Sequence, residues 1–265
     1  MSLLRIVTTS WDDGDPADLK LAGLLRSRGL PGTFYVPLTG YRGRPTVGAA
    51  DLRSLASEGF EIGGHGVSHR TLSDLPAEEI EREVRVSKQT LQDMLGRDIG
   101  MFSYPRGRYN KHVLQTLKAS SYVGARTTRM LAINLDFDRF EMPTSLQVYP
   151  HANWTYFRNI AKSRNAGRFL TYLRRFRGTQ SWVELGKALF DRVLEEGGIW
   201  HVFGHSWEIQ ERGLWSGLEE ILEYVSKREG VLYLPNGEAL RLCPGITTAL
   251  RPTKEFCETQ DCSRT

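Results

Sequence analysis

The chain has 265 residues, of which 40% are apolar and 25% charged, with a net charge of +4 and a pI near 9.0. These values fit one large single domain with a buried core. They give no concentrated basic face of the kind that nucleic-acid-binding proteins carry, and no apolar stretch approaches the roughly 18 residues that span a bilayer.

Strand-like and helix-like segments alternate along the first two-thirds of the chain. We expect strands at 5–11, 32–37, 60–66, 101–105, 122–127 and 139–145, and helices at 16–29, 48–59, 76–96 and 110–121. Repeated βα units at this spacing predict a parallel sheet with helices packed outside it. Their number favours a closed barrel over an open sheet, and the first βα turn lacks the glycine pattern of a dinucleotide site.

The regular alternation of strand-like and helix-like segments stops in the remainder of the chain. Two consecutive helices are expected at 155–176 and 181–198, followed by a strand at 199–208, a helix at 217–230 and a short strand at 231–235. The tail beyond Pro244 is polar. We therefore predict one domain over residues 1–245, with a helical insertion at about 151–197, and a C-terminal tail over 246–265.

Cysteine usage and the N-terminal segment bear on the cellular compartment. The three cysteines are Cys243, Cys257 and Cys262, and an odd number near one end favours reduced thiols over a disulfide framework. The first residues show neither the apolar run nor the cleavage site of a signal peptide. We expect a cytoplasmic protein without an integral membrane segment.

Side chains with catalytic potential follow several of the predicted strands. The first strand ends in Asp12 and Asp13, the third leads into His65 and His69, and the last long strand ends in His205. In a parallel barrel, reactive groups gather at the C-terminal ends of the strands. The sequence therefore predicts that these five side chains converge.

The two histidines after the third strand have the spacing of a metal-binding pair. His65 and His69 are four residues apart in a loop that owes its backbone freedom to three glycines, at positions 63, 64 and 66. A carboxylate from Asp13 completes a set of two histidines and one carboxylate, which suits catalytic zinc or another divalent transition metal. The pair alone is a weak signal, and its position beside the aspartates strengthens it.

Asp12 and His205 have the chemistry of a base and an acid. Next to a metal ligand, Asp12 is placed to take a proton from water that the metal has made more acidic. The alternative is that Asp12 or Asp13 caps the helix that starts near Pro16, but Asp15 is available as that cap. His205 lies on the same strand face as His201, and at the barrel rim it suits a general acid that protonates a departing amine. We expect His201 to be a hydrogen-bonded core residue.

With these residues in place, the chain resembles the NodB-type polysaccharide deacetylases, carbohydrate esterase family 4. The family's T-F-D-D-G motif corresponds to "SWDDG" at 10–14, and its H-[ST]-x-x-H motif to "HGVSH" at 65–69, where Gly66 replaces the hydroxyl residue. "FSYPRGRYN" at 102–110 is similar to the third motif, and "VFGH" at 202–205 to the final strand and histidine. The resemblance covers about residues 4–240, apart from the helical insertion.

The resemblance implies an α/β fold, a distorted (β/α)7 barrel similar to a TIM barrel, with the helical insertion before the last strand. It also implies roles: Asp12 as the base, His205 as the acid, and the main-chain N–H of Arg106 in the oxyanion site. The metal ligands that it implies are Asp13, His65 and His69.

Two departures from the family pattern concern supporting residues. Ser103 stands where the family has an arginine that orients the base, and the resemblance leaves Arg106, Arg108 or Arg126 as substitutes. The family's D-x-x-D-W, which supports the acid histidine, has no clean match. Candidates for that support are Asp136, Asp138, Glu141, Trp207 and Glu208.

The sequence thus predicts a metal-dependent hydrolase that removes an N-acetyl or acyl-amide group from a sugar, in glycan or polysaccharide biosynthesis. The expected cofactor is a divalent metal, Zn²⁺ first and Co²⁺, Ni²⁺ or Mn²⁺ as alternatives. The expected substrate is an N-acetylated sugar, nucleotide-sugar or oligosaccharide, with no nucleic-acid partner; the oligomeric state is open. Two alternative hypotheses are an allantoinase-like hydrolase of a non-sugar amide and a non-catalytic glycan-binding barrel.

Overall fold

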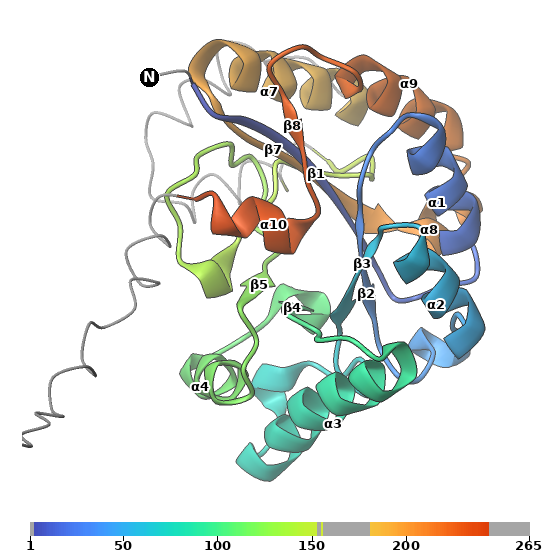
Figure 1. Cartoon of the computed structure of the whole chain (residues 1–265), viewed down its shortest axis with the longest axis vertical. Coiled ribbons are helices and arrows are strands. Elements are labelled where there is room, and N and C mark those ends of the chain that lie inside the picture. Colours follow the sequence, from blue (N-terminus) through green and yellow to red (C-terminus); the bar gives the residue numbers. More distant parts are fainter. Residues whose placement is uncertain (1–2, 153–154, 156–180, 244–265) are drawn as a thin grey trace, which may run out of the picture.

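The computed structural model of the chain describes residues 3–152, 155 and 181–243. They form a parallel sheet that curls into a barrel, with helices around its outside (Figure 1). The strands are β1 (Arg5–Asp12), β2 (Thr33–Val36), β3 (Glu61–Gly64), β4 (Met101–Ser103), β5 (Gly124–Arg126), β6 (Leu146–Gln147), β7 (Gly198–His205) and β8 (Leu232–Tyr233). The helices are α1 (Asp18–Ser27), α2 (Ala49–Ser57), α3 (Ala77–Leu95), α4 (Lys111–Ala119), α7 (Trp182–Glu196), α8 (Ser206–Glu211), α9 (Trp215–Val225) and α10 (Asn236–Arg241).

The strand order is β5-β4-β3-β2-β1-β7-β6, with β8 beside β1, and the pairs are parallel. The two ends of this order meet through residues 142–147, which we call the seam. Met142 forms a bridge to Arg126 of β5, and Leu146 pairs with Val202 of β7. The predicted distorted (β/α)7 barrel is thereby confirmed, and the distortion lies in the short closing segment.

β1 lies between β2 and β7, and one of its two faces lines the interior of the barrel. Its side chains alternate, as the pleat of a strand requires. Val7 and Trp11 belong to the core between the sheet and the helices. Thr8, Ser10 and Asp12 instead face the interior, where they bond to α10, β7 and β5 respectively. A line of polar groups therefore leads along the interior to the C-terminal end of β1.

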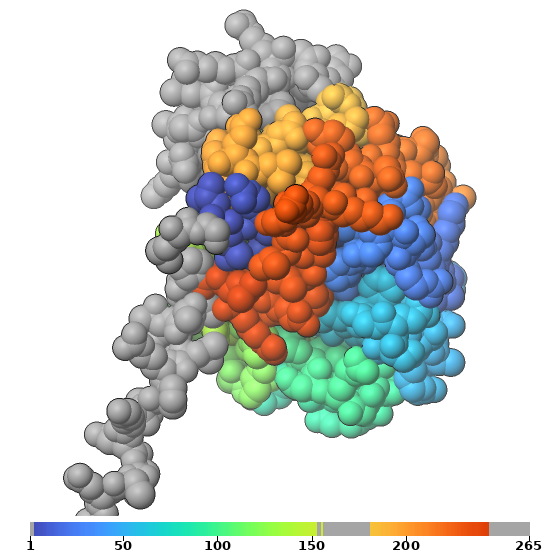
Figure 2. Space-filling view, turned by 45° about the horizontal axis from the view of Figure 1, so that its top comes forward, coloured from blue at the N-terminus to red at the C-terminus, as the bar shows by residue number. Residues whose placement is uncertain are grey.

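α10 closes the opposite, N-terminal end of the barrel. Leu240 packs in one cluster with Ile6 at the start of β1 and Met101 at the start of β4. Asn236 accepts a hydrogen bond from Thr8 and donates one to Tyr35. Figure 2 shows this C-terminal segment in red across the front face, beside the dark blue start of the chain. The C-terminal ends of the strands lie at the other end of the barrel.

Several predicted element boundaries were wrong. The segment 139–145 is not a strand: residues Arg139–Glu141 form a 3₁₀ turn, whose start is capped by the Asp138 side chain accepting from the Phe140 N–H at 2.7 Å. Pro143 then lacks the N–H that a strand would need. The strand predicted to reach residue 208 ends at His205, where α8 begins, and α10 was not predicted.

The helical insertion is described only in its second half. α7 confirms the helix expected at 181–198, and the Ser181 side chain caps it by accepting from the Glu184 N–H at 3.4 Å. The helix predicted at 155–176 lies outside the described residues except for Thr155, as do the tail, Cys257 and Cys262. The predicted domain boundaries stay a prediction. Within the described ranges, no helix combines the length and apolar character needed to cross a membrane.

Candidate metal centre

Three buried side chains converge at the C-terminal end of the barrel. Asp13 follows β1, and His65 and His69 follow β3. One donor atom from each lies within 4.8 Å of the other two. The Asp13 Oδ1 atom is 3.1 Å from Nε2 of His69 and 3.6 Å from Nε2 of His65. The structure therefore brings together the three residues predicted to bind a metal.

The protonation states of these side chains suit a cation. The Nδ1–H of His65 donates to the Ser103 carbonyl at 2.7 Å, which leaves Nε2 as the free, unprotonated nitrogen. Burial lowers the pKa of His65 to about 4, so the ring is neutral at pH 7. Burial raises the pKa of Asp13, but the imidazoles of His69, His205 and His65 outweigh burial and hold the pKa well below its usual range.

The carboxylate of Asp13 has one oxygen committed and one available. Its Oδ2 accepts from the indole Nε1 of Trp207 at 2.8 Å, whereas Oδ1 has no hydrogen-bond partner among the described residues. A buried charged oxygen without a partner is unfavourable unless a cation faces it. A carboxylate oxygen and two imidazole nitrogens form the donor set that divalent zinc and related metals prefer. The residues present therefore fit a divalent metal.

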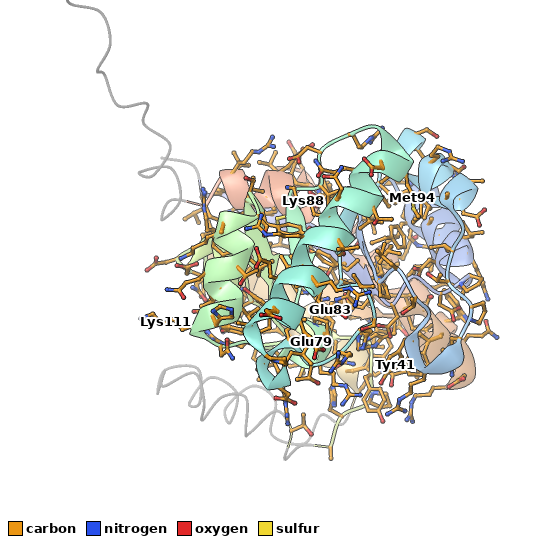
Figure 3. All side chains as sticks on the ribbon, turned by 90° about the horizontal axis from the view of Figure 1, so that it is seen from below. Tyr41, Glu79, Glu83, Lys88, Met94 and Lys111 are labelled. Carbon is orange, nitrogen blue, oxygen red and sulfur yellow. The ribbon has the colours of Figure 1, made fainter. Side chains whose placement is uncertain are left out.

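The loop that carries both histidines is held by α3. Glu83, from the buried face of that helix, accepts from the Val67 N–H at 2.7 Å and from the Ser68 N–H at 3.0 Å (Figure 3 labels Glu83). His69 itself adopts a left-handed conformation, with φ of 53°. The loop is therefore not helical, and an acidic side chain from another element fixes its shape.

The three glycines predicted to give this loop backbone freedom do not all have that role. Gly66 has φ of +79°, so it needs the conformational freedom of glycine. Gly63 and Gly64 are regular strand residues. A Cβ at Gly63 would lie 2.5 Å from the Tyr35 ring, and a Cβ at Gly64 2.5 Å from the Tyr122 hydroxyl. These two positions are small because the neighbouring rings fill the space.

Asp12 forms a buried ion pair with Arg126, the last residue of β5. The guanidinium donates to Asp12 Oδ1 and is fully buried, with its carbon 4.7 Å from the centre of the Phe203 ring. Burial raises the pKa of Asp12, but Arg126 and the imidazoles of His65 and His205 lower it more, so the net pKa is below its ordinary value. Asp12 is therefore an ionised carboxylate beside the three candidate ligands.

His205 lies across the site from Arg126, at the end of β7. Its Nε2 is 4.0 Å from Asp12 Oδ2, and its Nδ1 is 3.3 Å from Glu208 Oε2 in the first turn of α8. Burial lowers the pKa of His205, but its hydrogen bond to Glu208, with the Asp13 and Asp12 carboxylates, outweighs burial and raises the pKa above its usual value. This imidazole is poised to carry a proton.

The other predicted site residues lie as follows. His201 is fully buried and bonds to Ser10 Oγ at 2.8 Å and the Pro143 carbonyl at 3.0 Å, as expected for a core residue. Arg106 is exposed, in a 3₁₀ turn (Pro105–Gly107), and lines a groove that also contains His69.

Of the arginines left open by the sequence, Arg126 is the one paired with Asp12; Arg108 faces Asp74 at 4.0 Å. Among the carboxylates considered as support for His205, Glu208 makes the contact. Asp138 caps a turn, and Glu141 accepts a hydrogen bond from Tyr109 at 2.7 Å.

Comparison with known proteins agrees with this arrangement. Residues 4–125, which include both aspartates and both candidate metal-binding histidines, match the family described as polysaccharide deacetylase. The chain is also 30% identical over 133 residues to an uncharacterised protein of Streptomyces coelicolor, a match that covers 50% of this chain and 51% of that protein. The chain thus spans about half the length of this relative.

Solved structures share the fold over nearly the whole chain. A Mycobacterium smegmatis protein assigned as a polysaccharide deacetylase superposes with a TM-score of 0.68 at 18% identity, covering 98% of this chain and 96% of that one. A family 4 acetyl xylan esterase of Clostridium thermocellum, solved with a cobalt ion, superposes with a TM-score of 0.58 at 14% identity and covers 90% and 91% of the two chains. At these identities the likeness establishes the fold.

Proposed function

Because residues 4–125 match the polysaccharide deacetylase family, we propose that the chain hydrolyses the N-acetyl group of a sugar with the help of a divalent metal. Asp13, His65 and His69 would hold the metal, Asp12 would act as the base and His205 as the acid. The observation that supports this most is the meeting of three donor atoms within 4.8 Å beside a buried carboxylate and an imidazole. The same site suits no simple structural role, because it buries several charged groups.

When bound, the metal would polarise the acyl carbonyl and make water more acidic. Asp12 accepts a proton from the attacking water as the water oxygen bonds to the acyl carbon. His205 then gives a proton to the nitrogen as the carbon–nitrogen bond breaks, which yields acetate and a free amine. Because Nε2 of His205 lies 4.0 Å from Asp12 Oδ2, the proton gained by Asp12 has a short route back to His205.

Two arginines would serve the reaction in different ways. Arg126 keeps Asp12 ionised and fixes its orientation, since the pair is buried and one carboxylate oxygen is engaged. Asp12 Oδ2, on the side of His205, is then the oxygen that receives the proton. The main-chain N–H of Arg106, in the turn next to the groove of His69, is proposed to donate to the developing oxyanion.

Zinc is the metal that we propose first, with Co²⁺, Ni²⁺ and Mn²⁺ as alternatives, because two imidazoles and one carboxylate suit these ions. The proposed substrate is an N-acetylated sugar, nucleotide-sugar or oligosaccharide of glycan biosynthesis. The cytoplasmic location stays a prediction.

Release of acetate tests the proposal. Purified protein supplied with Zn²⁺ or Co²⁺ is expected to release acetate and a free amine in equal amounts from N-acetylglucosamine oligosaccharides. Turnover of hydantoin-type or other non-sugar amides, with no acetate from sugars, would instead favour an allantoinase-like hydrolase. Binding of the sugars without any turnover, in a folded and metal-loaded sample, would favour a non-catalytic barrel.

The ion pair of His205 with Glu208 predicts a pH effect. Glu208 raises the pKa of His205, and a general acid is lost as pH rises through its pKa. Glu208→Gln keeps a hydrogen-bonding side chain but removes the charge, so the pKa of His205 should fall and the alkaline limb of kcat/KM should move to lower pH. The loss of activity should be larger at pH 9 than at pH 6.

Glu211→Gln is the matched control for this pH profile. Glu211 lies on the same short helix, but its carboxylate pairs with Arg44 and not with His205. Its variant should keep the alkaline limb of the wild-type protein. An unchanged limb in Glu208→Gln would argue against His205 as the acid.

A further inference from the structure

A groove opens beside the candidate metal centre. It has a volume of about 430 Å³, and His69 and Tyr41 form its wall toward the centre. The Tyr41 and His69 rings lie 4.4 Å apart, centroid to centroid. In Figure 3, Tyr41 and Glu79 lie at the same end of the molecule, and Met94, at the other end of α3, lies away from them. A groove of this size accommodates a sugar and a substituent.

The groove is rich in positive charge. Three arginines line it, Arg42, Arg70 and Arg106, against one carboxylate, Asp74. Asp74 already faces Arg108, outside the lining, at 4.0 Å. An excess of guanidinium groups in a concave surface attracts anions and can bind a phosphate or a carboxylate through two parallel hydrogen bonds.

The three arginines differ in how far the protein already engages them. Arg70 forms an exposed ion pair with Glu79, and such pairs are easily exchanged for another anion. The Arg42 guanidinium carbon lies 5.2 Å from the centre of the Tyr41 ring, the same ring that contacts the His69 ring at a tilt of 54°. Arg42 and the proposed metal ligand His69 therefore lie against the same aromatic ring.

The backbone holds two of these arginines at defined positions. Arg42 and Arg106 have φ of 52° and 57°, in a region that favours glycine. Each sits inside a short 3₁₀ turn closed by a main-chain hydrogen bond, from Arg44 to Tyr41 and from Arg108 to Pro105. The two turns follow different strands, so their side chains reach the groove from separate loops.

We propose that this groove is an anion subsite, which binds a phosphate or carboxylate group carried by the acylated sugar, with Arg42 as its principal cation. This inference rests on the proposed deacetylase function and narrows its substrate class to acidic N-acetylated sugars, such as sugar phosphates, nucleotide-sugars or sugars with a carboxylate. An anion held there would place the rest of the sugar next to His69 and the reacting acyl group.

Binding of three sugars that lack an acetyl group tests the subsite without turnover. Glucose 1-phosphate, glucuronic acid and glucose are titrated calorimetrically into the zinc-loaded protein. We expect at least one of the two anionic sugars to bind about tenfold or more tighter than glucose, because charged hydrogen bonds are the strong ones. The preferred anion identifies the group as phosphate or carboxylate. Equal affinity for all three sugars would overturn the proposal.

The Arg42→Asn variant tests whether the anionic sugar binds in the groove. Asparagine tolerates the left-handed conformation, so the variant should fold, and its affinity for the anionic sugar should fall about tenfold, to near that for glucose. Lys227→Asn is the matched control, since Lys227 is also an exposed cation with positive φ (54°) but lies outside the groove. Arg70→Gln is a second test and should weaken the same affinity. Retention of full affinity in both groove variants would contradict the assignment.

Two outcomes distinguish a failure of the anion subsite from a failure of the deacetylase proposal. If the wild-type protein releases acetate from N-acetylglucosamine and from its 1-phosphate and carboxylate derivatives with equal kcat/KM, the subsite is wrong and the function stands. If anionic sugars bind in an Arg42-dependent way but no acetate is released from any of them, the subsite stands and the function is wrong.

Discussion

Asp12→Asn is expected to lower kcat for acetate release by roughly 10²–10⁴-fold, the usual contribution of a general base, while the protein still binds one metal ion. The reason is that Asp12 lies beside the three converging donor atoms without being one of them. Its carboxylate is ionised and paired with Arg126, and an amide in its place cannot take up the proton of water. Steady-state kinetics with metal analysis of the same sample measure both parts of this result.

The substitution also has an expected cost in stability. Arg126 is fully buried, and its Nε and Nη1 atoms have no hydrogen-bond partner among the described residues. Removing the charge of Asp12 leaves a buried guanidinium uncompensated, so the free energy of unfolding should fall by about 3 kcal/mol. Urea denaturation of the two proteins measures this difference.

Asp18→Asn provides the matched control for Asp12→Asn. Asp18 is a buried aspartate at the start of α1, and burial, with the nearby carboxylates, raises its pKa well above the usual value. A raised pKa favours the neutral carboxylic acid, so replacement by asparagine is expected to remove less charge at Asp18 than at Asp12. We expect kcat to change little. A similar loss of kcat in both variants would show that packing, and not the base, accounts for the effect.

Asp13→Ala should abolish metal binding in practice and activity with it. The available Oδ1 atom of Asp13 is 3.1 Å from the His69 nitrogen and 3.6 Å from the His65 nitrogen, so its loss breaks the donor set. Even partners behind metal ligands contribute 10–100-fold to affinity; we expect a fall of more than about 100-fold for this ligand. Isothermal titration with Zn²⁺, and dialysis against a chelator followed by metal analysis, measure the effect.

The Asp15→Ala variant tests whether removal of any aspartate from this loop weakens metal binding. Asp15 Oδ1 accepts from the Ala17 N–H at 2.9 Å and is not among the converging atoms. This variant should bind Zn²⁺ like the wild-type protein. Wild-type affinity in Asp13→Ala would rule out the proposed donor set. Full activity after exhaustive chelation would rule out metal dependence.

The features that were predictable from the sequence are the local ones. Asp12, Asp13, His65 and His205 each lie at or next to a strand end, and a parallel barrel brings all such ends to one rim. His201 and His205 share one face of β7, and their positions along the strand separate His201, in the core, from His205, at the rim. Residue type and periodicity were sufficient for these assignments, because each depends on only a few neighbouring positions.

The choice of arginine depends on the closed barrel and was not available from local pattern. β5 is four strands away from β1 in the sheet order, so Arg126 reaches Asp12 only across the interior. Arg106 and Arg108 are nearer to Ser103 in sequence, yet neither faces Asp12. Tertiary curvature decides between three residues that look alike in the sequence.

The sequence around two acidic residues, Glu208 and Glu83, indicated more about their contacts than we predicted. Glu208 is three residues after His205 at a strand-to-helix junction, a spacing that places the two side chains together once α8 begins at Ser206. Glu83 occupies the buried face of α3 beside Val84. A carboxylate at such a position indicates a partner in the interior, which here is the loop between His65 and His69.

Arg126 contacts the seam as well as the site. Its main chain bridges Met142, where the barrel closes, and its side chain holds Asp12. Main-chain hydrogen bonds hold this closure: the Thr127 N–H donates to the Met142 carbonyl at 2.8 Å, and the Met142 N–H donates to the Ala125 carbonyl at 3.0 Å. Opening of these bonds would move the guanidinium away from the base. The closure of the barrel wall and the charge state of the base are therefore coupled through one residue, Arg126.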